Sequence, residues 1–243
     1  MYLFSDFDGT LTSQGKIDQR FFEFLNLLRA QKLQLVVVSG RSLAWGQFLL
    51  THFPIDYAIM EGGGVLVCRH QGRIGFDLLL EKNDLERLEL ITEKVIAQFG
   101  EEIFSDDSLG RLSDRAIELQ ALSEEKLEEI KAFLSQCGAH MSQSNIHLNF
   151  WVGQVSKALG LRKLIEQYLN LDVEKLRKNS LYFGDSANDE TAFEFFENSV
   201  GVSNIQSVLG QLKFRPKYVL SGQENEEIGG VIEFLKKYST GAK

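Results

Sequence analysis

Apolar runs and amphipathic segments alternate in the first part of the chain. The mainly apolar runs at 2–8, 33–38 and 57–60 are typical of short strands buried on both faces of a sheet. Between them, residues 18–30 and 43–52 repeat apolar side chains with helical spacing. This β-α-β-α-β order predicts a parallel sheet with right-handed crossovers.

The first of these helices carries two specific expectations. Asp18 is a suitable N-cap residue, because its carboxylate can accept a hydrogen bond from the first turn. The apolar stripe that we expect to face the core consists of Phe21, Phe22, Leu25 and Leu28.

The pattern changes after residue 60. Two alternating runs, 65–69 and 73–78, flank Gln71-Gly72, a combination that predicts a β-hairpin. From residue 81 the order becomes helix, strand, helix, strand, strand, which indicates a small α+β layer. The expected helices are 84–99 and 123–137, the second capped by Ser123, and the expected strands are 115–119, 140–142 and 146–152.

The α/β alternation returns at residue 154. The expected strands are 180–184, 199–202 and 217–220, and the expected helices are 157–168, 189–197, 205–212 and 226–238. The predicted fold class is therefore α/β. We expect a Rossmann-like three-layer core with a parallel sheet, built from 1–80 and 154–243, and an inserted smaller α+β domain at 81–153.

Composition narrows the function classes. The 243 residues are 44% hydrophobic and 25% charged, as in ordinary globular proteins. The net charge of −8 argues against nonspecific nucleic-acid binding, which needs a basic surface. The sequence has no apolar stretch of membrane-spanning length and does not open with a secretory-signal pattern. We therefore expect a cytoplasmic protein with neither a nucleic-acid nor a membrane partner.

Polar side chains follow three of the expected strands. Asp6 and Asp8 close the first, Ser39-Gly40-Arg41 follows the second, and Asp185 to Asp189 follows 180–184. Open α/β sheets bind ligands at the carboxyl ends of their strands. Carboxylates gathered there repel one another, so they need a cation or a shared proton.

Four segments in this order resemble the motifs of the haloacid dehalogenase superfamily of phosphohydrolases. They are Asp6-Phe-Asp8-Gly9-Thr10, Ser39-Gly40-Arg41, Lys157 in the first turn of a helix, and Asp185-Ser-Ala-Asn188-Asp189. In that superfamily an insert between the second and third motifs is a type II cap, and the α+β pattern here resembles subclass IIB. Taken singly, the segments also fit an ordinary turn, a solvated lysine and helix-capping acids.

The resemblance implies a role for each core residue. Asp6 would be the nucleophile that forms an aspartyl-phosphate. Asp8 would protonate the leaving group and then activate water. Ser39, the Gly40 amide and Lys157 would bind the phosphoryl oxygens.

The resemblance also implies a Mg²⁺ cofactor, held by the Asp6 carboxylate, the Asp8 backbone carbonyl and the Asp185 carboxylate. An all-oxygen cluster without histidine suits Mg²⁺ better than zinc. The supporting residues would be Thr10, Arg41, Asn188 and Asp189, with Asp189 orienting a water ligand or Lys157.

Cap residues are the candidates for substrate specificity. Arg111 and Arg115 lie in a polar segment that resembles arginine-bearing cap segments of sugar-phosphate phosphatases. His147 alternates with Asn149 and Trp151 on an expected strand. Each of these positions also fits a solvated turn or an outward-facing polar residue.

The expected function is a Mg²⁺-dependent phosphatase for a small phosphorylated metabolite, with a sugar phosphate favoured. The resembled class includes sucrose-phosphate and trehalose-phosphate phosphatases. Two alternatives stay open: a sugar phosphomutase like the eukaryote-type phosphomannomutases, and a non-catalytic binding module of the same fold. The few basic residues of the cap favour hydrolysis, and a silent site would have no reason to keep repelling carboxylates. Neither the physiological substrate nor an oligomeric state follows from these residues.

Overall fold

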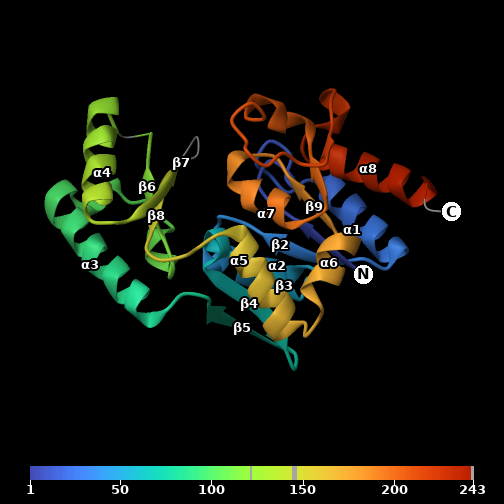
Figure 1. Cartoon of the computed structure of the whole chain (residues 1–243), viewed down its shortest axis with the longest axis horizontal. Helices are drawn as coiled ribbons and strands as arrows, with labels where there is room; N and C mark the ends of the chain where they lie inside the picture. The colour runs from blue at the N-terminus through green and yellow to red at the C-terminus, as the bar shows by residue number, and fades with distance from the viewer. Residues whose placement is uncertain (121, 144–146, 242–243) are drawn as a thin grey trace.

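The computed structural model describes residues 1–120, 122–143 and 147–241. Figure 1 shows a larger core, which contains both ends of the chain, beside a smaller layer built from the middle of the sequence. In the described part of the chain, no helix has the length and hydrophobicity needed to cross a membrane.

The core is organised around an eight-stranded sheet of order β11-β10-β9-β1-β2-β3-β4-β5. β1 lies between β2 and β9 and pairs with both in parallel, whereas β4 and β5 form an antiparallel hairpin at one edge. The strands are β1 (Tyr2–Ser5), β2 (Gln34–Val38), β3 (Tyr57–Met60), β4 (Val65–His70), β5 (Arg73–Leu78), β9 (Leu181–Gly184), β10 (Asn198–Gly201) and β11 (Tyr218–Val219).

Helices cover both faces of this sheet and make three layers. On one face lie α1 (Gln19–Gln31), α2 (Leu43–His52) and α8 (Glu227–Gly241), and on the other α5 (Lys157–Lys163), α6 (Val173–Asn179) and α7 (Glu190–Phe195). Leu3 packs with the first group and its neighbour Phe4 with the second, because successive strand residues point to opposite faces. The predicted α/β three-layer core is therefore confirmed.

α1 confirms one expectation and corrects another. The Asp18 carboxylate caps the helix by accepting a hydrogen bond from the Arg20 amide. The core face, however, consists of Phe21, Phe24 and Leu28, while Phe22 is 53% exposed. Phe24 rather than Phe22 completes the i, i+3, i+7 spacing of one helix face.

Two elements of the second half differ from the sequence prediction. α6 was not expected, because it is only 7 residues long and its only apolar residues are Val173 and Leu176, which pack partly buried against the core. Asp172 caps it by accepting from the Lys175 amide at 2.6 Å. The expected helix at 205–212 is only a 3₁₀ turn over Ser203–Ser207. The expected helix at 157–168 continues from α5 into a π-helical turn at Leu164–Tyr168.

The inserted cap is a three-stranded antiparallel sheet of order β6-β8-β7 covered by two helices. Its elements are α3 (Lys82–Phe99), β6 (Arg115–Glu118), α4 (Glu124–Gln136), β7 (His140–Gln143) and β8 (His147–Trp151). Residue 146 of the expected last strand lies outside the described residues. The domain boundaries at 80 and 153 stay a prediction.

The two faces of the cap sheet have different surroundings. Ile117, Leu148 and Phe150 pack against α3 and α4, which lie on the side of the sheet farther from the core (Figure 1). By strand alternation, His147 and Asn149 belong to the opposite, uncovered face.

Candidate active site

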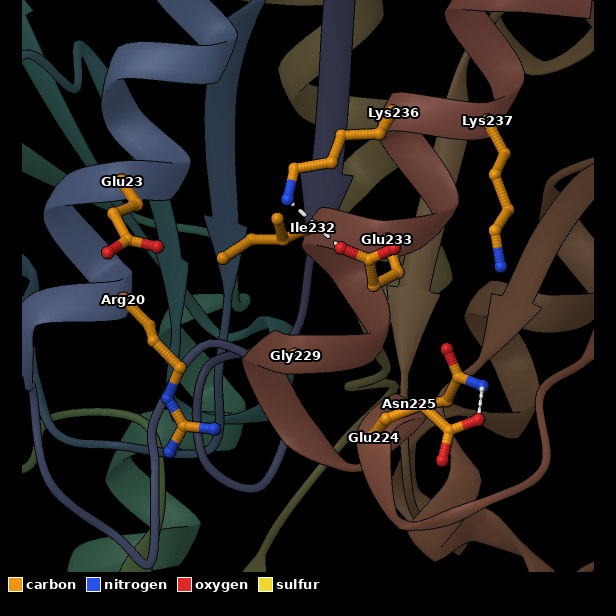
Figure 2. Close-up of a pocket in the computed structure, with 9 residues that line it drawn as sticks. All are labelled: Arg20, Glu23, Glu224, Asn225, Gly229, Ile232, Glu233, Lys236 and Lys237. Carbon is orange, nitrogen blue, oxygen red and sulfur yellow. Dashed lines mark hydrogen bonds and ion pairs between the residues drawn. The ribbon is translucent and has the colours of Figure 1, made fainter.

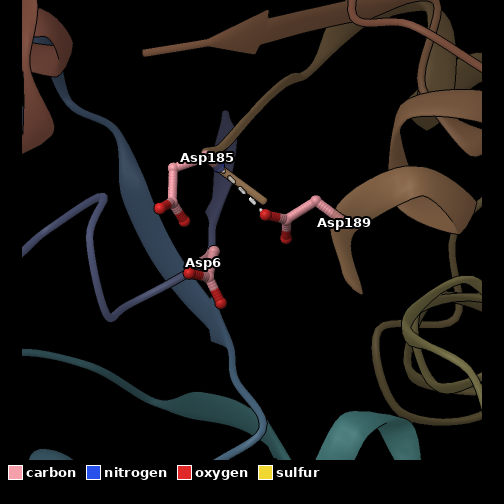
Figure 3. A group of neighbouring side chains, drawn as sticks. All are labelled: Asp6, Asp185 and Asp189. Atoms are coloured by element: carbon pink, nitrogen blue, oxygen red, sulfur yellow. Dashed lines mark hydrogen bonds between the residues drawn. The ribbon is translucent and has the colours of Figure 1, made fainter. Parts of the chain in front are cut away.

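Three carboxylates converge at the carboxyl end of the central strands (Figure 3). Asp6 follows β1, Asp185 follows β9, and Asp189 ends the 3₁₀ turn before α7. One oxygen from each carboxylate lies within 4.8 Å of the others. The Asp6 amide donates to the Phe183 carbonyl at 2.8 Å, so the loop that follows β1 is tied directly to β9. The topology thus brings together acids that are about 180 residues apart in the sequence.

Lys157 lies between two of these acids. Its Nζ donates to Asp6 Oδ1 and to Asp189 Oδ1, both at 2.6 Å, and its side chain is only 2% exposed. Lys157 is the first residue of α5, and Ser156 caps that helix by accepting from the Leu159 amide. A buried ammonium needs such charged partners, because desolvation without them is very costly.

The buried charges shift one another's pKa values. Burial, with the charges of Asp189 and Asp8, raises the pKa of Asp6 to about 7, although Lys157 opposes the shift. Burial and the charges of Asp6 and Asp189 raise the pKa of Asp185 well above its ordinary value. Burial alone would lower the pKa of Lys157, but Asp189 and Asp6 raise it. The single positive charge of Lys157 is therefore too small to neutralise three ionised carboxylates.

Asp189 is fully engaged by protein donors. Its Oδ1 accepts from Lys157 and from the Tyr182 hydroxyl at 2.5 Å, and its Oδ2 accepts from the Asp185 and Ser186 amides at 3.0 and 3.1 Å. In the described residues, Asp6 Oδ2 accepts no hydrogen bond. Asp189 is thus suited to orient Lys157, while Asp6 retains an oxygen for a ligand or a reacting atom.

Asp185 is held by the loop that follows β1 and by the turn that follows β10. Thr10 Oγ1 donates to its Oδ1 at 3.3 Å, and Asn204 Nδ2 donates to its Oδ2 at 2.8 Å. Gly9 has a φ of 73°, and a Cβ there would overlap an Asp185 carboxylate oxygen. Glycine at this position is therefore required by the close approach of the two loops.

Asp8 points to a different partner from Asp6. Arg41 donates Nε to Asp8 Oδ2 at 2.8 Å and Nη2 to Asp8 Oδ1 at 2.7 Å, and its guanidinium lies over the Trp45 ring. The hydrogen bonds to the Asp8 carboxylate raise the pKa of the Arg41 guanidinium. The Asp8 side chain, 40% exposed, lies outside the three-carboxylate cluster.

Ser39 and Gly40 follow β2, the strand next to β1, so they lie at the same edge of the sheet as Asp6. The buried Ser39 donates its amide to the Ile59 carbonyl at 2.8 Å, and its Oγ accepts from the Arg41 amide at 3.1 Å. The Gly40 carbonyl accepts from Arg111 at 3.1 Å. We call residues 39–41 the phosphate loop.

The remaining predicted residues have varied surroundings. Asn188 is exposed and accepts from the Ser186 hydroxyl at 2.8 Å. Arg111 is buried against acids of the cap, and Arg115 donates to the backbone carbonyls of residues 111 and 114. His147 Nε2 lies 3.1 Å from Glu118 Oε2 on the uncovered face of the cap sheet.

Sequence reasoning missed Asn204 and Tyr182. Asn204 Nδ2 bridges Asp185 and the Gly9 carbonyl, and its Oδ1 accepts from the Glu227 amide at 3.1 Å. Asn204 follows β10, so the rule that sites form at the carboxyl ends of parallel strands could have found it. Tyr182 lies inside an apolar run, where a tyrosine gives no sign that its hydroxyl reaches an active-site acid.

Away from the carboxylate cluster, a hollow lies between α1 and the region around α8 (Figure 2). It has a volume of about 440 Å³, and Arg20, Glu23 and Glu233 are among its lining residues. None of the predicted site residues lines it. The candidate active site is the carboxylate cluster, because it brings together the predicted residues Asp6, Asp185 and Asp189.

Comparisons with known proteins find solved structures that share this fold. The sucrose-phosphatase of Synechocystis, solved in complex with sucrose and phosphate, matches with a TM-score of 0.70 at 20% identity over 98% of both chains. A Thermoplasma acidophilum protein matches with a TM-score of 0.68 at 17% identity over 97% of both chains. A trehalose-6-phosphate phosphatase related protein matches with a TM-score of 0.64 at 16% identity over 100% of both chains.

These structural similarities establish a shared fold. None of the curated proteins matches the chain significantly. The family model for haloacid dehalogenase-like hydrolases matches residues 3–109 and 101–235, which together span nearly the whole sequence. The chain therefore belongs to the haloacid dehalogenase-like hydrolase family.

Proposed function

We propose that this protein is a Mg²⁺-dependent phosphatase that hydrolyses a small phosphorylated metabolite, a sugar phosphate, through an aspartyl-phosphate on Asp6. The observation that carries the proposal is the buried group of Asp6, Asp185 and Asp189 with Lys157 bonded to two of its members. Such a concentration of buried charge is costly to keep unless it performs chemistry.

The donor set fits a divalent oxygen-seeking cation. Two carboxylates about 4 Å apart repel by roughly 4 kcal/mol at an effective dielectric of about 20. This repulsion contributes to the raised pKa values of Asp6 and Asp185. Mg²⁺ would be held by these two carboxylates and the Asp8 carbonyl, and it would supply positive charge to offset both the acids and a phosphate dianion.

Asp6 would act as the nucleophile. Lys157 holds the Asp6 Oδ1 atom, and the backbone of β9 holds the Asp6 amide. The Oδ2 atom is left to form a bond to phosphorus. As that bond forms, the bond from phosphorus to the substrate oxygen breaks, and Asp8 gives the leaving oxygen a proton. Asp8 then takes a proton from water, whose oxygen attacks phosphorus and releases inorganic phosphate with free Asp6.

In the structure Arg41 holds Asp8 as a carboxylate at the open side of the cluster, so Asp8 must take up a proton before it can act as the acid. For proton transfer, the Asp8 carboxyl must leave Arg41 and reach the leaving oxygen. Its 40% exposure gives the side chain room for that movement. Ser39, the Gly40 amide and the Lys157 ammonium would meanwhile bind the phosphoryl oxygens.

Two observations support a sugar phosphate as the substrate class. The similar structures include a sucrose-phosphatase and a trehalose-6-phosphate phosphatase related protein. The uncovered face of the cap sheet also carries polar side chains: His147, beside Glu118 Oε2 at 3.1 Å, and Asn149, whose amide donates to Asp114 at 2.9 Å. Arg115 and His147 would contact the distal part of the substrate.

The proposal is tested by supplying the purified protein with Mg²⁺ and comparing sugar, nucleotide and amino-acid phosphates. Inorganic phosphate release should be fastest with a sugar phosphate and should cease in Asp6→Asn. A matched control is Asp56→Asn, which changes an exposed carboxylate paired with Arg69. Appreciable Mg²⁺-dependent turnover by Asp6→Asn would reject Asp6 as the nucleophile, and isomer formation without phosphate release would indicate a mutase.

A further inference from the structure

A buried arginine of the cap reaches the phosphate loop of the core. The Arg111 side chain is 2% exposed, and its Nη1 donates to the Gly40 carbonyl at 3.1 Å. The same guanidinium donates to Asp114 at 2.9 Å and, through Nε and Nη2, to Asp107 at 3.2 and 3.1 Å. With these donors committed and almost no surface exposed, Arg111 has little capacity left to bind a substrate.

The chain around Arg111 is fixed to the core by a second contact. Glu61, directly after β3, is buried with a φ of 53°, a backbone conformation that is uncommon outside glycine. Its Oε2 accepts from the amides of Leu112 and Ser113 at 3.0 and 2.7 Å, and from the Ser113 hydroxyl at 2.8 Å. Its Oε1 accepts from the Leu43 amide at 3.0 Å, at the start of α2.

Together these contacts hold every carbonyl of the phosphate loop. Ser39 O accepts from the Gly62 amide at 3.1 Å, Gly40 O accepts from Arg111, and Arg41 O accepts from the Glu61 amide at 2.9 Å. In the described residues, the Gly40 amide donates to no protein acceptor. Because the carbonyl and the amide of a trans peptide point in opposite directions, holding Ser39 O leaves the Gly40 N–H facing away from the core support.

The Arg111 contact also bears on the Ser39 hydroxyl. Gly40 O and the Arg41 amide belong to one peptide plane, so fixing the carbonyl fixes the amide. That amide donates to Ser39 Oγ at 3.1 Å, which leaves the hydroxyl hydrogen free to donate to a phosphoryl oxygen. A cap side chain is thereby connected to a proposed phosphate ligand through a single peptide unit.

We propose that Arg111 is a positioning residue for the phosphate loop, acting on the phosphoryl group through the Gly40–Arg41 peptide and not by touching the substrate. The inference rests on the proposed phosphatase function and assigns Arg111 a role different from the substrate contact expected from sequence. It also makes the cap a structural part of phosphate binding for every substrate.

The first test measures the loop itself. Arg111→Met alone would leave Asp114 buried without its cation, so the main variant is Arg111→Met/Asp114→Asn. Amide hydrogen exchange of residues 39–43 should accelerate at least about tenfold in this variant, because the loop opens more often. Asp114→Asn alone is one control. Arg177→Met is the second, because Arg177 also donates to a backbone carbonyl, that of Phe195 at 2.7 Å, but far along the chain from the phosphate loop.

The second test separates positioning from substrate contact. Inhibition by inorganic phosphate should weaken about 10- to 100-fold in the double variant, as expected for a misplaced binding group. The value of kcat/KM should fall by a similar factor for p-nitrophenyl phosphate and for sugar phosphates, because all share the phosphoryl group. Arg177→Met should retain wild-type phosphate inhibition, and Asp114→Asn, which keeps Arg111 itself, should lose less than the double variant.

Each result decides between the roles. A loss confined to sugar phosphates, with unchanged phosphate inhibition, would make Arg111 a substrate contact and overturn the inference. A lower melting temperature with unchanged exchange at 39–43 would make its role merely structural and would also overturn it. If the wild-type protein hydrolyses nothing, the proposed function fails, while hydrogen exchange still decides whether Arg111 orders the loop.

Discussion

The Tyr182 hydroxyl donates to Asp189 Oδ1 at 2.5 Å, and the same oxygen accepts from Lys157. Tyr182 lies on β9 and is completely buried, so its hydroxyl has no water to bond with in place of Asp189. Burial and the charge of Asp189 raise the pKa of Tyr182 well above its ordinary value, which keeps the hydroxyl a donor. A core tyrosine thus helps to set the position of the active-site lysine.

Tyr182→Phe should therefore affect both stability and catalysis. Hydrogen bonds to charged groups contribute about 1.5–3 kcal/mol, so urea unfolding should show a loss of that order. Release of Asp189 should let Lys157 shift and lower kcat. Tyr168→Phe is the matched control, because Tyr168 hydrogen-bonds Asp77 near the surface. Unchanged kcat in Tyr182→Phe would show that Asp189 needs no help from the tyrosine.

Lys157→Ala should raise KM and lower kcat together. The substitution removes the cation that touches both Asp6 and Asp189 and leaves two buried carboxylates facing each other. Breaking a buried pair on one side costs about 3–5 kcal/mol, which thermal or urea unfolding will register. Lys163→Ala, at the other end of α5, is the helix control. Steady-state kinetics identical to wild type would place Lys157 outside the reaction.

Asp8→Asn should discriminate between leaving groups. An alkyl phosphate needs a proton on its departing oxygen, whereas p-nitrophenolate leaves readily without one. We expect a loss of about 10²- to 10⁴-fold in kcat/KM for a sugar phosphate and a much smaller loss for p-nitrophenyl phosphate. Equal losses for both substrates would contradict the acid role of Asp8.

Metal-free stability should depend on pH through Asp6. Its pKa is raised from the ordinary 3.8 to about 7 in the folded protein. Between these values the folded state binds more protons than the unfolded state, so the free energy of unfolding should fall as pH rises from about 4 to 7 and then level off. Urea unfolding in EDTA should show this slope, reduced in Asp6→Asn. Adding Mg²⁺ should restore stability most strongly above pH 7. An identical slope in Asp6→Asn would mean that other groups cause it.

Much of the site was predictable because it obeys one rule of parallel sheets. Asp6, Ser39 and Asp185 each follow a buried strand, and adjacent parallel strands end at one edge. Their convergence therefore needs only the strand assignments, which apolar runs reveal well. The same rule also covers Asn204, which follows β10.

The hydrogen-bond partners of individual side chains could not be predicted from the sequence. The pairing of Asp8 with Arg41, the hydroxyl of Tyr182 on Asp189, and the Glu61 contacts to the cap all join segments whose separation carries no local signal. α6 was missed for another reason, because a helix of 7 residues with only two apolar side chains, Val173 and Leu176, resembles a loop in sequence.

By itself, the order of apolar and polar residues determined the three-layer core, the inserted cap and the edge of the sheet where the acids meet, because strand burial and crossover handedness act locally and repeat. Only the tertiary structure decided that Arg111 supports the Gly40 carbonyl and that Lys157 lies between two acids. Such contacts depend on how cap and core pack in three dimensions, and packing of distant side chains leaves no periodic trace along the chain.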